Sequence, residues 1–168
     1  NEWHRVSASH NTVVVDGENH ISMEGGLVEI FDDHEIKSSV KDVYPGINYE
    51  RHLKLTEDQF VDEFRVAAVG THTYDYFFHV EAALATQVKA NPASLGYEKN
   101  GYQHIQEVEK IVRDVNMVEL CWRLGELNLM SRLTLKDGQE LFIAKTFDNP
   151  ASSVRTTLII RESGNQAG

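Results

Sequence analysis

The 168-residue chain has one cysteine, Cys121, and therefore cannot form an intrachain disulfide. Cys121 lies in the largely apolar segment Val118–Trp122, and we interpret it as a small buried hydrophobic residue. A single thiol does not exclude an oxidising compartment, because a domain of this size can be stable without disulfides. The sequence also lacks any apolar run near the roughly 20 residues that cross a bilayer. We therefore expect no membrane partner.

Basic residues are also few. Sixteen lysines and arginines stand against 26 aspartates and glutamates, which gives a formal net charge of −10. This excess of negative charge argues against nucleic acid as a partner, because its phosphates would be repelled. It does not exclude an acidic polysaccharide, since a local cluster of arginine, histidine or metal can bind carboxylate or sulfate groups whatever the net charge.

Hydrophobic residues make up 41% of the chain and charged residues 25%, which is typical of a soluble globular protein. The length suits one domain with a real core, and we predict a single domain over residues 1–168. The chain opens at Asn1 with no initiator methionine and no signal-peptide or transit-peptide pattern, and structured sequence follows almost at once. We therefore expect it to be a piece of a longer protein.

Alternating polar and apolar residues dominate the sequence and predict half-buried antiparallel strands. The clearest case is Ile47–Leu55, in which every second residue is apolar except Arg51. The acidic run Asp32–Glu35 is interpreted as the solvated end of a hairpin. Further strands are predicted within residues 28–40 and at 60–69, 74–83, 118–122, 127–135, 140–147 and 154–161.

Turn residues separate these strands. Lys136–Gln139 predicts a hairpin, and Asp148–Pro150 predicts another turn. For Gly101–Val112 we keep two alternatives, a short helix or an irregular segment with one more strand. The polar tail Glu162–Gly168 is expected to be frayed. Many short strands with regular turns indicate an all-β antiparallel sandwich with at most one short helix.

A histidine and an asparagine stand directly before a β-branched run in Ser7–Gly17. Residues 12–15 predict a strand, because branched side chains suit a pleated surface, and Asp16-Gly17 predicts the turn that ends it. His10 and Asn11 are therefore expected at the mouth of a strand, where a rigid sheet can direct their side chains.

The segment Thr71–His79 carries a second group of polar residues. Asp75 and His79 have the same parity along a strand and share a face, whereas His72 has the other parity. A histidine oriented by an aspartate is a familiar catalytic or metal-supporting pair. However, four residues along a strand span about 13 Å, which excludes direct contact without a bend. We therefore favour a structural hydrogen-bond network over a catalytic role.

Arginines are the best candidates for binding carboxylates, because the guanidinium group forms two parallel hydrogen bonds. Arg51 stands out because it interrupts an apolar strand face, and Arg5 and Arg65 are the other candidates. The alternative for Arg51 is a structural ion pair with one of the many acids.

Several segments, in order along the chain, resemble the heparinase II/III-like polysaccharide lyases. The run SASHNTVVVDG at Ser7–Gly17 is similar to the signature of that family, and THTYDYFFH at Thr71–His79 is similar to a second segment. Further family patterns are resembled by Val43–Gly46 followed by Tyr49–Arg51, by the segment Leu53–Phe64, and by the closing strand from Arg155 to Arg161. The family pairs a helical toroid with a C-terminal antiparallel β-sandwich, and this chain resembles only the sandwich.

The resemblance implies that the whole protein cleaves a uronic-acid polysaccharide, such as a heparin-like glycosaminoglycan or alginate, by β-elimination. The catalytic groups of such lyases lie mainly on the toroid, so we assign no catalytic residue to this chain and expect it to be inactive alone. The resemblance also implies zinc binding by His10. The other zinc ligands would precede Asn1, so the ligand set within the chain would be incomplete.

We expect Arg5, Asn11 and Arg51 to contact substrate, and His72, Asp75 and His79 to play supporting or structural roles. The expected partners are the acidic polysaccharide and the N-terminal toroid, in a periplasmic or secreted protein, with a cytoplasmic location left open. Two alternatives remain: a non-catalytic carbohydrate-binding sandwich, and a purely structural docking module.

Overall fold

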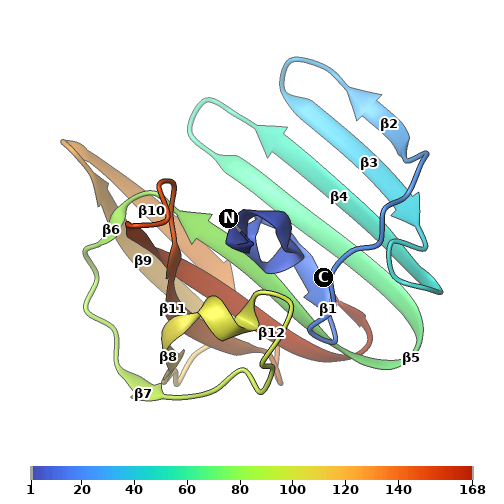
Figure 1. Cartoon of the computed structure of the whole chain (residues 1–168). Helices are drawn as coiled ribbons and strands as arrows, with labels where there is room; N and C mark the ends of the chain where they lie inside the picture. Colours follow the sequence, from blue (N-terminus) through green and yellow to red (C-terminus); the bar gives the residue numbers. More distant parts are fainter. Residues whose placement is uncertain (1, 168) are drawn as a thin grey trace. The chain divides into compact units, whose positions relative to one another are not determined.

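A computed structural model describes residues 2–167 and shows an antiparallel all-β architecture (Figure 1). The helices in this range are three-residue 3₁₀ turns, η1 (Trp3–Arg5), η2 (Ser7–Ser9) and η3 (Tyr102–His104). None of them is long and apolar enough to cross a membrane. The predicted all-β class is therefore confirmed. For Gly101–Val112, the structure combines a short helical turn with one more strand.

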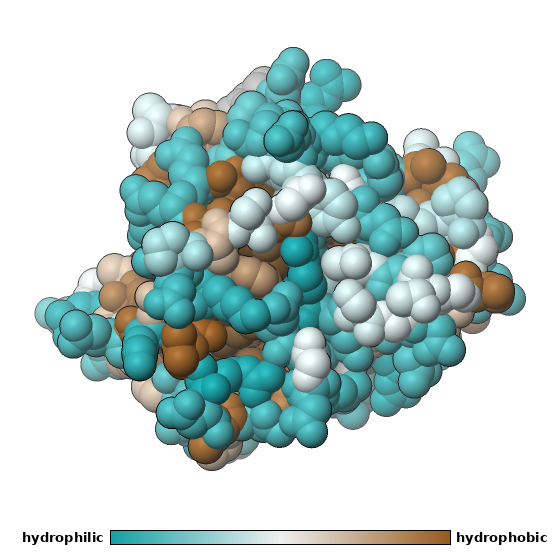
Figure 2. All heavy atoms as spheres, turned by 90° about the horizontal axis from the view of Figure 1, so that it is seen from below, coloured by the Kyte–Doolittle hydropathy of each residue, from teal (hydrophilic) through white to brown (hydrophobic). Residues whose placement is uncertain are grey.

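The chain divides into two compact units. The first contains the residues up to Asn19 together with Tyr74–Glu162, and the second contains His20–Thr73 and the chain from Ser163 onward. Figure 2 shows that hydrophilic residues cover most of the surface in that view, with apolar residues between them, as expected from the acidic composition.

The second unit is built from an antiparallel meander of β2 (Leu27–Phe31), β3 (Glu35–Lys41), β4 (Ile47–Leu55) and the first part of β5 (Phe60–Val80). The predicted hairpin end lies between β2 and β3. There the Oδ1 atom of Asp32 accepts hydrogen bonds from the backbone N–H groups of His34 and Glu35, both at 2.8 Å. An aspartate that binds the backbone two and three residues ahead stabilises a tight turn.

The two faces of this meander differ in chemistry, because directly paired residues share a face. On one face, the ammonium group of Lys37 contacts Glu29 at 2.8 Å and Glu50 at 3.0 Å. On the other face, apolar side chains at one end stay largely exposed, with Phe31 at 79%. The further exposed apolar residues on that face are Val28, Ile36, Leu55 and Phe60.

Two sequence predictions about strand length were wrong, one for β5 and one for the last strand of the chain. Residues 60–69 and 74–83 were predicted as two strands, yet β5 is one strand of 21 residues that passes through Gly70 at a φ of 97°. The tail was expected to be frayed, yet β12 (Val154–Ala167) continues through it. In the second unit the hydroxyl groups of Thr73 and Ser163 lie 3.4 Å apart, so a polar sequence still forms a strand where it has a neighbour.

The first unit contains two sheets (Figure 1). One sheet places β1 (Val13–Val15) and the second part of β5 beside β12, β11 (Glu140–Phe147), β8 (Gln106–Ile111) and β7 (Ala90–Pro92). The other sheet consists of β10 (Leu127–Thr134), β9 (Met117–Leu124) and β6 (Ala83–Leu84). The turn at Lys136–Gln139 connects these two sheets, because β10 pairs with β9 and β11 pairs with β12 and β8. The predicted hairpin was therefore wrong.

The two sheets pack face to face through one apolar cluster, which confirms the predicted sandwich. Leu120 and Trp122 of β9 are fully buried against Leu141 and Leu158 of β11 and β12. The indole N–H of Trp122 donates to the Ser131 hydroxyl at 2.9 Å, so its polar atom is satisfied inside the core.

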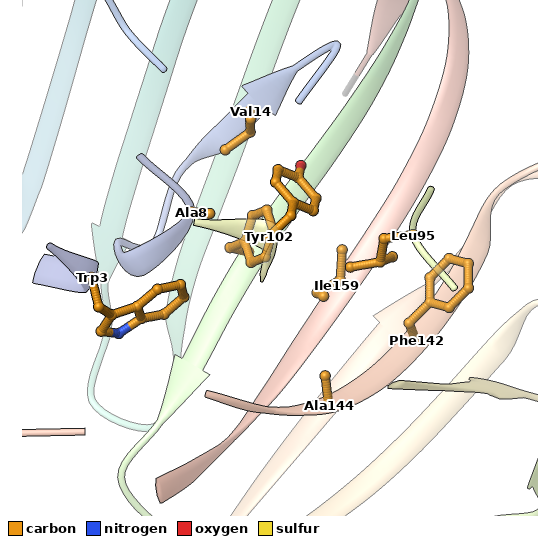
Figure 3. Close-up of a cluster of buried hydrophobic side chains, with 9 residues drawn as sticks. Trp3, Ala8, Val14, Leu95, Tyr102, Phe142, Ala144 and Ile159 are labelled. Atoms are coloured by element: carbon orange, nitrogen blue, oxygen red, sulfur yellow. The ribbon is translucent and has the colours of Figure 1, made fainter. Parts of the chain in front are cut away.

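A second apolar cluster covers the opposite face of the larger sheet (Figure 3). Trp3 and Ala8 come from the N-terminal turns, and Leu95 and Tyr102 come from the connection between β7 and β8. The sheet contributes Val14, Phe77, Phe142, Ala144 and Ile159. Because Trp3 is completely buried and donates its indole N–H to the Phe147 carbonyl at 3.0 Å, the N-terminal segment is an integral part of this core.

Candidate functional site

The two sequence motifs meet in the first unit. Strand β1 pairs with β5 in the register Val13↔Tyr76, which brings the residues before β1 beside the end of β5. The backbone N–H of His79 donates to Asn11 Oδ1 at 2.7 Å, and the backbone N–H of Phe77 donates to the Thr12 carbonyl at 2.9 Å. The segment before β1 is therefore attached to β5 by side-chain and backbone hydrogen bonds.

The His79 side chain is buried, with 8% of the residue exposed. Its Nε2 lies 3.0 Å from the Ala8 carbonyl and its Nδ1 lies 2.8 Å from the Thr157 hydroxyl. Because a carbonyl only accepts, Nε2 carries the proton and Nδ1 accepts from Thr157. The Thr157 oxygen in turn lies 2.8 Å from the Thr146 hydroxyl, which donates to it. The hydrogen bonds therefore run in one direction, from Thr146 to Ala8.

His79 is held in its neutral form. Burial, together with the nearby positive charge of Arg155, lowers its pKa from 6.5 to about 3. The hydrogen bond to the Ala8 carbonyl acts the other way, because it favours a protonated ring. A neutral imidazole with both nitrogens engaged is suited to fixing structure at neutral pH.

Arg155, in β12, lies over the same segment. Its Nη2 donates to the Ser9 carbonyl at 3.2 Å. Its Nη1 is 3.9 Å from Asp148 and 4.0 Å from Glu81, distances that are too long for hydrogen bonds. The Arg155 side chain is 17% exposed, and its buried Nε has no hydrogen-bond partner within residues 2–167. The hydrogen bond to the Ser9 carbonyl is therefore shorter than either contact of the Arg155 guanidinium with a carboxylate.

His10 is exposed at the end of η2, at the mouth of β1, as the sequence predicted. Among residues 2–167, no group of three histidine, cysteine, aspartate or glutamate side chains is placed to hold a metal ion. The described residues therefore do not fit a zinc centre, which usually needs three or four protein ligands. Zinc binding by His10 stays a prediction that needs ligands from elsewhere.

The other predicted substrate-binding residues lie in different settings. Asn11 uses its amide oxygen to bind the His79 backbone, and Arg5 is exposed at the end of η1. In the second unit, the Nε and Nη2 atoms of Arg51 bind both carboxylate oxygens of Asp62 at 2.9 and 2.7 Å. The guanidinium also lies 4.6 Å from the centre of the Phe64 ring. The structural ion pair with Asp62 is therefore formed, and it occupies the Nε and Nη2 side of the Arg51 guanidinium.

Asp75 belongs to a separate buried network and is 1% exposed. Arg161 binds both of its carboxylate oxygens at 2.7 Å, and the Tyr102 hydroxyl donates to Oδ2 at 2.6 Å. Burial raises the pKa of Tyr102, and the adjacent Asp75 carboxylate raises it further. Asp75 and His79 thus share a face of β5 but bind different partners. His72 lies in the second unit, with its Nε2 3.4 Å from the Val69 carbonyl.

Sequence reasoning missed Arg155, Arg161 and Tyr102. Arg155 and Arg161 have the same parity in a predicted strand, together with the buried Thr157 and Ile159. Two arginines on the buried face of a strand indicate buried acidic or carbonyl partners, because an arginine is rarely buried without a partner. That signal was present in the sequence. Tyr102 carried no signal of its own, since it lies in a segment without periodicity.

Comparison with known proteins assigns the chain to a family. The model of the heparinase II/III-like C-terminal domain matches residues 1–155. The chain belongs to this family. No curated protein matches the chain significantly. The heparinase II/III-like C-terminal domain is a module of polysaccharide lyases, and the match includes His10, Asn11, His79 and Arg155. The predicted family is therefore confirmed.

Proposed function

We propose that this chain is the C-terminal module of a lyase that cleaves a uronic-acid polysaccharide by β-elimination. In this reaction a base removes the proton next to the uronate carboxylate, and an acid protonates the departing glycosidic oxygen. Neutralising the carboxylate makes that proton more acidic, so the site needs hydrogen-bond donors or cations there. The proposed partners are a helical toroid that carries the catalytic groups and an acidic polysaccharide such as heparan sulfate or alginate, in a periplasmic or secreted enzyme.

The match of the heparinase II/III-like C-terminal model to residues 1–155 carries this proposal. The arrangement around His10 agrees with it. His10 is exposed, while the residues on both sides of it are fixed to β5 and β12. A rigid sheet that presents one imidazole at its rim is suited to completing a site on another domain, because precise placement comes from the supporting shell.

The experiment compares the isolated chain with the longer lyase that contains it. Both are incubated with heparin, heparan sulfate and alginate, and the ultraviolet absorbance of the unsaturated uronate product is followed. We expect product from the longer lyase and none from the isolated chain. Product from the isolated chain would overturn the assignment of the catalytic groups to another domain. Absence of product from the longer lyase on all three polymers would overturn the proposed substrate class.

A matched pair of variants tests the role of His10 within the longer lyase. Removing the imidazole with His10→Ala is expected to lower the rate by about 10-fold or more, the usual loss when a group that supports a site is removed. His34→Ala removes another exposed histidine, in the turn between β2 and β3, and is expected to leave the rate unchanged. Equal rates for the two variants would remove His10 from the site.

A further inference from the structure

We propose that His79 and Arg155 are positioning residues that fix the backbone from Ala8 to Asn11, so that the His10 imidazole is presented outward in one orientation. The inference rests on the proposed function, because it assigns a task to His10. It goes beyond that function because it gives His79 and Arg155 one defined task, the placement of the backbone on both sides of His10.

Three donors hold three residues of this segment. His79 Nε2 donates to the Ala8 carbonyl at 3.0 Å, and Arg155 Nη2 donates to the Ser9 carbonyl at 3.2 Å. The backbone N–H of His79 donates to Asn11 Oδ1 at 2.7 Å. The residue between these points is His10, whose backbone N–H closes the η2 turn on the Ser7 carbonyl at 3.1 Å. His10 is thus bracketed on both sides while its side chain stays exposed.

The donors come from the larger sheet of the unit. His79 lies in β5 and Arg155 in β12, neighbouring strands of the larger sheet. The held residues Ala8 and Ser9 are 0% and 5% exposed. Side chains whose rotamers are locked by packing transmit the position of a sheet to a loop. A loop without such contacts would sample several conformations on the surface.

The side chains of His79 and Arg155 are suited to donating hydrogen bonds to the Ala8 and Ser9 carbonyls. The Ala8 carbonyl requires a proton on His79 Nε2, and the Thr157 hydroxyl supports this tautomer by donating to Nδ1. Arg155 keeps a buried Nε without a partner within the described residues, and its acids at 3.9 and 4.0 Å are too far away for hydrogen bonds. Its one direct hydrogen bond to the segment is therefore the contact with Ser9.

The first test measures hydrogen exchange on the isolated chain. Arg155→Lys keeps the charge but loses the planar fork, and Thr157→Val keeps the shape but removes the hydroxyl that donates to His79 Nδ1. Both are expected to raise the exchange rate of the Ser9–Thr12 amides at least tenfold relative to the amides of β9 and β11. The matched control is Arg132→Lys, which alters an exposed ion pair with Glu119 in the other sheet. Unchanged exchange at Ser9–Thr12 in both variants would overturn the inference.

The second test uses the longer lyase and a double-variant cycle. If Arg155 acts through His10, then Arg155→Lys lowers kcat/KM on its own but causes no further loss in a His10→Ala background. If Arg155→Lys lowers kcat/KM by the same factor in the wild type and in the His10→Ala background, the positioning role is overturned. A failure of the proposed function gives no lyase activity in any variant and leaves the exchange result intact, so the two ideas fail separately.

Discussion

The buried neutral state of His79 predicts that the protein loses stability in mild acid. Its folded-state pKa of about 3 lies below the ordinary value of 6.5, so between these values the unfolded chain binds a proton that the folded chain does not. The stabilisation is therefore fully present above about pH 6.5 and is lost as the pH falls toward 3. Each pH unit within this window removes about 1.4 kcal/mol. Lowering the pH from about 6.5 to about 5 removes about 2 kcal/mol, and the full window amounts to roughly 5 kcal/mol.

Urea unfolding followed by tryptophan fluorescence measures this effect. Both tryptophans, Trp3 and Trp122, lie in the first unit, and the Trp3 ring is 6.2 Å from the His79 ring. Carboxylates also titrate as the pH falls, so the quantity to compare is the change in unfolding free energy from about pH 6.5 to about pH 5. His79→Gln is expected to reduce this change by about 2 kcal/mol, and the control His34→Gln is expected to preserve it.

An equal pH dependence in the wild-type chain and in His79→Gln would refute the reasoning. If His79→Gln does not fold, nitrogen chemical shifts of the wild-type histidines give the same information. The His79 ring is expected to remain in the Nε2-protonated neutral form down to about pH 4.5, because its pKa is about 3. A charged His79 ring in that range would contradict the burial argument.

Two further predictions concern the stability of the first unit. Tyr102→Phe removes the hydroxyl that donates to Asp75 at 2.6 Å and is expected to lower the free energy of unfolding by about 1–3 kcal/mol in urea titrations; an unchanged urea midpoint would show that the carboxylate does not need this donor. Gly17→Ala places a methyl group 2.6 Å from the Tyr97 ring at a φ of 68°. It is expected to lower the thermal midpoint more than Gly138→Ala, which has a φ of 85° but no atom within 4 Å of its added methyl group.

The strand pattern of this fold could be read from periodicity. Ile47–Leu55 and Glu140–Phe147 match β4 and β11 residue for residue, because each alternates or is strongly apolar and ends at turn residues. Connections between sheets could not be read in the same way. Lys136–Gln139 has hairpin chemistry, yet it joins two sheets, since local turn residues do not specify which strands will pair. The full length of β5 was not predicted, because Gly70 interrupts the strand pattern of the sequence although the strand continues through it.

The candidate site could be predicted in part. The position of His10 at the mouth of a strand followed from the residues on either side of it. The partners of His79 did not follow, because Ala8 contributes a backbone carbonyl and Thr157 lies 78 residues away. Backbone acceptors have no sequence signature, and distant hydroxyl groups are recognised only when the fold brings them together. Arg155 and Arg161 were the missed residues with a signal in the sequence, because they are two charged side chains on a buried strand face.

Salt acts in opposite ways on the two faces of the β2–β5 meander. The contacts of Lys37 with Glu29 and Glu50 are weakened by added ions, which screen exposed charges. Sulfate strengthens the tendency of apolar groups such as Phe31 to leave water. Concentrated ammonium sulfate should therefore precipitate this chain readily through that surface, whereas dilute buffers should keep it dispersed.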